Sequence, residues 1–143
     1  MTVQAILAPV FAQVLLIFVL MVWMGRVRFA EIKAGSVAAG DVSLGERNWP
    51  PRAQRSANAF SNQFELPMLF FALVPLALYT KKADLLFVVL AWLFVTSRAV
   101  HAGVYVTSNH VPSRFRAYAL GALVLLAMWI VFAVRIFLAP IGL

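Results

Sequence analysis

Long apolar runs separated by short polar segments make up most of this sequence. The runs cover about residues 3–24, 64–79, 85–105 and 117–138, and a polar lead-in lengthens the second one. Each run, with its lead-in, approaches the ~20 residues that an α-helix needs to cross a bilayer. Backbone groups cannot stay unpaired in lipid, and no alternating pattern indicates barrel strands. The pattern predicts an all-α membrane protein, a bundle of four transmembrane helices at about residues 3–28, 50–80, 83–108 and 113–140.

Polar segments between the runs have the composition of loops and turns. Residues 30–51 contain three glycines and the pair Pro50–Pro51, which predicts the one long loop. Because proline suits the first turn of a helix, we expect the second helix to open at Asn48 or Pro50. No internal repeat interrupts the chain, so residues 1–143 should form a single domain. Short turns are predicted at residues 81–84 and 108–113.

Composition supports a lipid environment. Hydrophobic residues make up 64% of the chain and charged residues 12%, with a mean hydropathy of +0.92. An average soluble domain is about 25% charged. A soluble fold of this length leaves a large share of its surface in water and could not hide so much apolar area. Zero cysteines exclude disulfides and thiolate sites, and two histidines without carboxylate help predict no metal site.

The formal net charge of +7 reflects membrane topology better than nucleic-acid binding. Basic residues flank the apolar runs, as the positive-inside rule expects, and no basic run with interleaved aromatics is present. We therefore expect no nucleic-acid partner, and we expect cytoplasmic first and third loops with both termini on the other side. The first loop and its flanks carry Arg26, Arg28, Lys33, Arg47, Arg52 and Arg55, the third carries Arg114 and Arg116, and the opposite side has Lys81, Lys82 and Arg135.

Two polar stripes interrupt the apolar helices. Charged side chains cost at least ~2.5–3.5 kcal/mol each inside a membrane, so they tend to be paired or functional. The first stripe lies on the second helix, where spacings of 3, 4 and 3 place four polar residues on one face. Its members are Arg55, Asn58, Asn62 and Glu65. Pro67 lies two residues after Glu65 and predicts a kink in the helix.

The second stripe lies on the third helix and continues into the next turn. Its members are Arg98, His101, Tyr105 and Asn109. With the predicted orientation, both stripes lie at similar depth, and Arg98 is the natural partner of Glu65. A Glu–Arg lock between helices explains that pair alone. The combined stripes favour a polar pocket for an anionic or amphipathic ligand, although His101 also suits an interior packing role and Tyr105 an interfacial anchor.

The motifs in these stripes resemble those of the MAPEG family, the membrane-associated proteins in eicosanoid and glutathione metabolism. Asn62-x-x-Glu65 followed by proline is similar to the family motif of the second helix. Arg98-x-x-His101-x-x-x-Tyr105 is similar to that of the third helix. The resemblance covers nearly the whole chain and suggests a bacterial member.

The resemblance implies a four-helix bundle that assembles as a homotrimer, in a bacterial inner membrane, with glutathione bound near the cytoplasmic side as co-substrate. It implies that Arg114, or else Arg116, lies near the thiol and favours the thiolate. Lowering a thiol pKa in this way raises the population of the nucleophile. Positioning of the tripeptide would involve Arg55, Asn58, Asn62, Glu65, Arg98, His101 and Tyr105.

Three functions follow as hypotheses. The first is a glutathione transferase or peroxidase acting on lipophilic electrophiles. The second is a non-catalytic lipid-binding or scaffold protein on the same fold. Two departures from the family pattern favour this alternative: Asn58 replaces a usual arginine, and Leu66 replaces a frequent aromatic residue. The third is a small proton-coupled exporter with Glu65 as the proton carrier, which pairing of Glu65 with Arg98 would disfavour.

Overall fold

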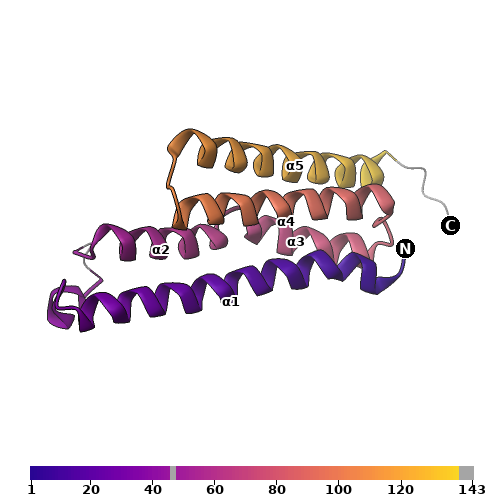
Figure 1. Ribbon diagram of the computed structural model, residues 1–143. Coiled ribbons are helices and arrows are strands. Elements are labelled where there is room, and N and C mark those ends of the chain that lie inside the picture. Colours follow the sequence, from indigo (N-terminus) through magenta and orange to yellow (C-terminus); the bar gives the residue numbers. More distant parts are fainter. Residues whose placement is uncertain (46–47, 139–143) are drawn as a thin grey trace.

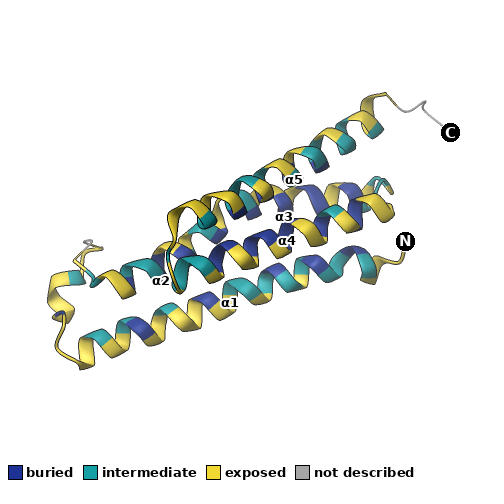
Figure 2. Ribbon diagram, turned by 45° about the horizontal axis from the view of Figure 1, so that its top comes forward, coloured by how far each residue is buried: buried dark blue, intermediate teal, exposed yellow. Residues whose placement is uncertain are grey.

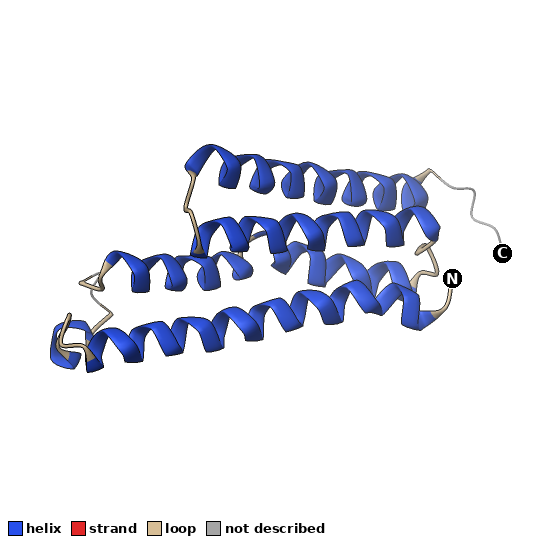
Figure 3. Ribbon diagram, in the orientation of Figure 1, coloured by secondary structure: helices blue, strands red, loops and turns tan. Residues whose placement is uncertain are grey.

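The computed structural model describes residues 1–45 and 48–138, and in these ranges every regular element is a helix, with no strand (Figure 3). Four stretches in it are long and apolar enough to cross a membrane, which confirms the predicted fold class. The elements are α1 (Val3–Lys33), the 3-10 helix η1 (Ala39–Val42), α2 (Pro51–Ser61), the 3-10 helix η2 (Asn62–Phe64), α3 (Leu66–Tyr79), α4 (Leu85–Val106) and α5 (Val111–Phe137). The second span consists of α2, η2 and α3 together, Pro51–Tyr79.

The four spans run up and down beside one another (Figure 1). The connections α1–α2 and α4–α5 lie at one end of the bundle, and the turn α3–α4 lies at the other end beside the start of α1. At the first end, α1 and α2 extend farther than α4 and α5. The polar residues of α2 therefore lie close to the end that carries the first and third loops.

Helix boundaries differ from the predicted ones mainly at the first loop. Helix α1 continues to Lys33, so its 31 residues include the start of the segment predicted as loop, and η1 adds one further helical turn. Helix α2 begins at Pro51 with Pro50 as its N-cap, which favours Pro50 over Asn48 as the opening residue. Arg47 and the predicted end of the last helix near residue 140 lie outside the described residues.

A break divides the second span close to Glu65. After η2 the backbone of Glu65 takes φ −96° and ψ −101°, which is not helical, and α3 restarts with Pro67 in its first turn. Proline has no N–H to donate to the fourth residue before it, here Gln63, and its ring collides with that carbonyl. The predicted kink is thus a complete interruption, one that separates the polar half of the span from its apolar half.

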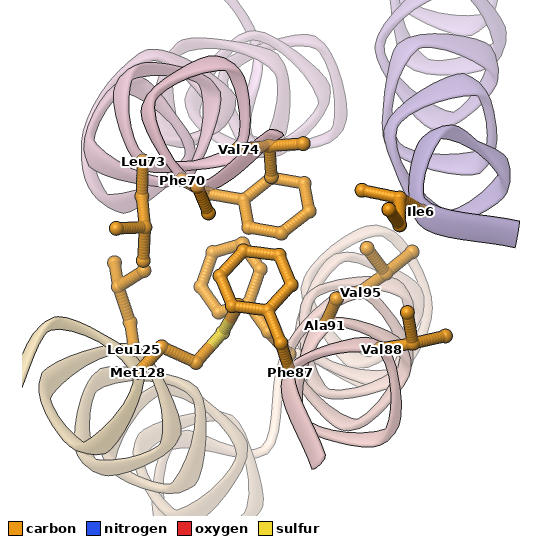
Figure 4. Packing of buried hydrophobic residues seen from close by; sticks show 12 residues of the cluster. Ile6, Phe70, Leu73, Val74, Phe87, Val88, Ala91, Val95, Leu125 and Met128 are labelled. Atoms are coloured by element: carbon orange, nitrogen blue, oxygen red, sulfur yellow. The ribbon is translucent and has the colours of Figure 1, made fainter. Parts of the chain in front are cut away.

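Side chains of α3, α4 and α5 form the main core, with Ile6 of α1 at its edge (Figure 4). The rings of Phe70 and Phe94 are fully buried, with centroids 4.9 Å apart. On the outward faces, large apolar side chains stay exposed along every span, for example Phe11 at 71% and Leu123 at 65% (Figure 2). Acyl chains rather than water suit such a surface.

Candidate functional site

Asn62 joins the two polar stripes. Arg98 of α4, with 0% of its surface exposed, donates a hydrogen bond from Nη2 to Oδ1 of Asn62. Asn62 in turn donates from Nδ2 to Oε2 of Glu65 at 2.8 Å. The amide therefore bridges a buried cation and a carboxylate, and its orientation is fixed by both.

The prediction of a direct ion pair between Arg98 and Glu65 is wrong. Among residues 1–45 and 48–138, the ion pair within 4 Å joins Arg135 and Asp84, at the other end of the bundle. The helical break explains the difference, since Glu65 no longer continues the face of α2 and its side chain is exposed. Asn62 remains helical and takes the place next to Arg98.

A cavity of about 260 Å³ opens beside Asn62. Its polar wall combines three spans: η2 contributes Asn62, α4 contributes His101 and Tyr105, and α5 contributes Arg114 and Tyr118. Val111 and Phe115 complete the lining. Two of the four residues of the predicted stripe of the third helix, His101 and Tyr105, therefore meet the start of the fourth helix in one cavity.

Arg114 is held rigidly at this cavity. Its guanidinium carbon lies 4.1 Å from the ring centroid of Tyr105, a cation–π contact. Nη1 donates to Oδ1 of Asn109 at 2.6 Å. Asn109 has φ +51°, a left-handed conformation that asparagine tolerates better than most residues. The turn before α5 thus positions the arginine, and Asn109, the last member of the second stripe, acts through it.

His101 presents one free ring nitrogen. Its Nδ1 lies 2.9 Å from the backbone oxygen of Arg114, and since a carbonyl only accepts, Nδ1 carries a proton. Nε2 is buried and has no hydrogen-bond partner within the described part of the chain. The ring packs between Tyr105 and Tyr118, at centroid distances of 5.7 and 5.6 Å. In neutral imidazole, Nε2 is then an acceptor available to a ligand or water.

Arg98 also has unused hydrogen-bonding capacity. Its Nε and Nη1 are buried without a partner among the described residues, and its guanidinium lies 5.2 Å from the centroid of Tyr118. Unpaired buried donors are costly, so water or a ligand group is expected to satisfy them. The structure therefore places a positively charged, incompletely satisfied wall behind the cavity.

Two predicted site residues of α2 lie away from this cavity. Arg55 donates from Nε to the oxygen of Pro51 and from Nη1 to the oxygen of Thr107, which ties α2 to the end of α4. Asn58 accepts a hydrogen bond from Nε2 of Gln54 at 2.8 Å. Asn58 lines a separate polar cavity of about 290 Å³, whose other walls include Arg28 and Trp49.

Arg114 and Arg116 face different sides of α5. Arg116 is exposed and lines an outward groove between α4 and α5, not the polar cavity. Two residues along a helix correspond to a rotation of about 200°, so the separation follows from helical geometry. Of the two arginines that the sequence offered, Arg114 has the geometry of a site residue.

Tyr118 also lines the cavity, although it is not among the site residues predicted from the sequence. Its spacing of four residues from Arg114 was the available signal, since such residues share a helix face. Gln63 was also missed. It is buried next to the break and accepts a hydrogen bond from Gln13 of α1.

Four apolar spans with a polar, cationic cavity near one end of the bundle define an integral membrane protein. The model of the MAPEG family matches residues 6–134, and the chain belongs to this family of membrane proteins of glutathione and eicosanoid metabolism. No curated protein and no solved structure matches the chain.

Proposed function

We propose that the protein is a glutathione transferase or peroxidase acting on lipophilic electrophiles. The observation that carries this proposal is the fixed position of Arg114, whose guanidinium lies over Tyr105 at the polar cavity. A thiol placed beside a guanidinium has a lowered pKa, because the cation stabilises the thiolate. The protein has no cysteine of its own, so the thiol must belong to the ligand.

The reaction would proceed by attack of the glutathione thiolate on an electrophilic carbon. A carbon–sulfur bond forms while the leaving group, or the opened ring oxygen, departs with its electron pair. Nε2 of His101 is a buried acceptor in the same cavity, without a hydrogen-bond partner among the described residues, and can take the thiol proton. Asn62 and Glu65 offer an amide and a carboxylate suited to the ammonium and backbone groups of the γ-glutamyl residue.

One copy of the chain does not enclose a tripeptide. The cavity volume of about 260 Å³ falls just below the ~300–1,000 Å³ that is common for small-molecule sites, and Glu65 is exposed beside it. A neighbouring copy in a homotrimer, which the family resemblance implies, would complete the walls. We further propose a bacterial inner membrane with cytoplasmic first and third loops, because the loop end of the bundle carries most of the basic residues.

A non-catalytic lipid-binding or scaffold role is the second candidate. One observation favours it: Asn58 bonds to Gln54, and none of the described residues of α2, its cations included, lines the cavity. Fewer cations predict weaker binding of a tripeptide that carries two carboxylates. Binding and turnover therefore have to be measured separately.

Turnover of a chromogenic electrophile with glutathione, in detergent micelles, tests the proposal. Wild-type protein should exceed the non-enzymatic rate and saturate with glutathione, and Arg114→Ala should lower the rate towards background. Calorimetric titration with glutathione should show binding to the wild type. Binding without turnover would support the lipid-binding or scaffold alternative, and neither binding nor turnover would overturn the glutathione assignment.

A further inference from the structure

The outward side of the α4–α5 pair carries a groove of about 360 Å³ that is distinct from the polar cavity. Its long walls consist of exposed apolar side chains, with Leu93 at 51%, Val100 at 53% and Leu120 at 56%. Because α4 and α5 both span the membrane, this groove faces the hydrocarbon region along most of its length.

Small residues form the floor of the groove. Ser97 and Ala117 are buried there, and the hydroxyl of Ser97 donates to the oxygen of Phe94 at 2.6 Å. That bond turns the serine oxygen towards its own helix, so the floor offers methylene and methyl groups. From Leu93 to Val100 the groove follows α4 for about 10 Å, at 1.5 Å per residue. A narrow apolar channel of this length suits an extended acyl chain.

A single cation stands at the loop end of the groove. Arg116 is exposed, lies five residues after the start of α5, and forms no hydrogen bond or ion pair within residues 1–45 and 48–138. Ser113, one turn nearer the loop, lies 2.8 Å from Nδ1 of His110 through its hydroxyl. A guanidinium at this depth can reach the headgroup layer and bind phosphate oxygens in a bidentate manner.

We propose that the groove between α4 and α5 binds an anionic phospholipid of the surrounding bilayer, with one acyl chain along the groove and the phosphate on Arg116. Charge complementarity selects the occupant, since Arg116, which has no acidic partner in the part of the chain that the structure describes, lies at the headgroup end of an apolar channel. The site is independent of the glutathione proposal, because Arg116 and Arg114 face different sides of α5.

Native mass spectrometry of the detergent-purified protein, titrated with equal amounts of phosphatidylglycerol and phosphatidylcholine, tests this site. We expect the wild type to prefer phosphatidylglycerol by about fivefold, the ratio that corresponds to ~1 kcal/mol for one arginine near an anionic headgroup. Arg116→Gln should abolish this preference. The matched control Arg52→Gln removes another exposed arginine at the same end of the bundle and should retain it. Val100→Trp fills the groove and should weaken binding of both lipids.

Three outcomes would overturn the assignment. Equal loss of preference in Arg116→Gln and Arg52→Gln would indicate general attraction to the basic loops. Unchanged lipid binding in Val100→Trp would place the lipid elsewhere. Disulfide-linked dimers of Val100→Cys in native membranes, in a chain otherwise free of cysteine, would show that a second copy covers the groove.

Discussion

Gln13 of α1 donates a hydrogen bond from Nε2 to Oε1 of Gln63, at 2.9 Å, in the turn between α2 and α3. Both side chains are buried, at 0% and 1% exposure. Gln63 also donates to the oxygen of Ala59, so its orientation is fixed. The pair attaches the long first helix to the break in the second span and supports the segment that carries Asn62.

Replacing either glutamine should destabilise the bundle by leaving the other amide unpaired in an apolar setting. We expect Gln13→Leu and Gln63→Leu each to lower the free energy of unfolding by ~0.6–1.7 kcal/mol, the range of hydrogen bonds between membrane helices. The double variant should lose less unfolding free energy than the two single variants lose together, because neither amide is left buried without its partner. Thermal unfolding in detergent measures this coupling. Strictly additive losses would mean that the hydrogen bond contributes nothing.

Arg114 should matter for catalysis through its charge. We expect Arg114→Ala to lower the glutathione-dependent rate by about 10²-fold, the usual effect of removing one electrostatic group. Arg114→Lys should recover part of the rate, because it restores a cation without the same contact to Tyr105. The ultraviolet absorbance of bound thiolate should show a raised thiol pKa in Arg114→Ala.

Arg116→Ala is the matched control, since Arg116 lines the outward groove and not the cavity. It should keep the absorbance profile of the wild type. If the two alanine variants shifted that profile equally, the assignment of Arg114 to the thiol would fail.

Glu65→Gln separates binding from transport. Glutamine keeps an oxygen that can accept the hydrogen bond from Asn62, so the fold should be retained. Loss of the negative charge should weaken glutathione binding, which calorimetry detects as a higher Kd. If the variant bound glutathione normally but lost pH-driven transport in vesicles, the exporter hypothesis would replace the transferase.

Helices α4 and α5 pack tightly at Gly121. A Cβ added there would stand 2.6 Å from Oγ of Ser97, too close for any real contact. Gly121→Ala should therefore lower thermal stability, because Ser97 must leave its hydrogen bond with Phe94. Ser97→Ala in the same chain removes the colliding oxygen, and the double variant should regain most of the stability. Persistence of the full loss would point to a backbone clash instead.

Asp84 caps α4 and pairs with Arg135. Its Oδ1 accepts from the backbone N–H of Phe87 at 3.0 Å, and hydrogen bonds from Arg135 hold the pKa of the carboxyl below its usual range. The pKa of Asp84 in the folded protein lies below the unfolded value of about 3.9. The ionised carboxylate therefore stabilises the fold fully above about pH 3.9, and this stabilisation is lost as the pH falls through the folded pKa.

Asp84→Asn should keep the cap and lose only the charge pair, worth ~0.2–1 kcal/mol at this exposure. Asp84→Ala should lose about 1 kcal/mol more through the missing cap. Melting temperatures at neutral and acidic pH test both effects. The difference between wild type and Asp84→Asn should vanish in acid, and a constant difference would contradict the role of the carboxylate.

The sequence was sufficient to predict what depends on composition and periodicity. Four spans and the polar face of the third helix follow from run length, from spacings of three and four, and from the cost of polar groups in lipid. The structure confirms the four spans, and it places His101 and Tyr105 of the polar face in one cavity. The exact breaking point of the second span could not be read from its pattern.

That break decides which polar residues meet. Pro67 predicted a bend, but the backbone of Glu65 turns its carboxylate to the exposed surface, where Asn62 intervenes before Arg98. A stripe derived from ideal helical spacing assumes an unbroken helix, so it cannot predict where the non-helical backbone at Glu65 directs the side chain. Similarly, the sequence leaves Arg116 open as the alternative to Arg114, and the structure places only Arg114 at the polar cavity and Arg116 at the outward groove.

Helix α1 is longer than a membrane requires. Its 31 residues extend about 46 Å, against a hydrocarbon thickness of about 30 Å. Together with α2 it extends beyond the ends of α4 and α5 (Figure 1). This surplus carries the first loop out into water, so the polar cavity lies where two phases meet. A water-soluble tripeptide would reach the cavity from the aqueous side, and its lipophilic reaction partner would enter from the bilayer. The tripeptide would not have to cross lipid, and the lipophilic partner would not have to cross water.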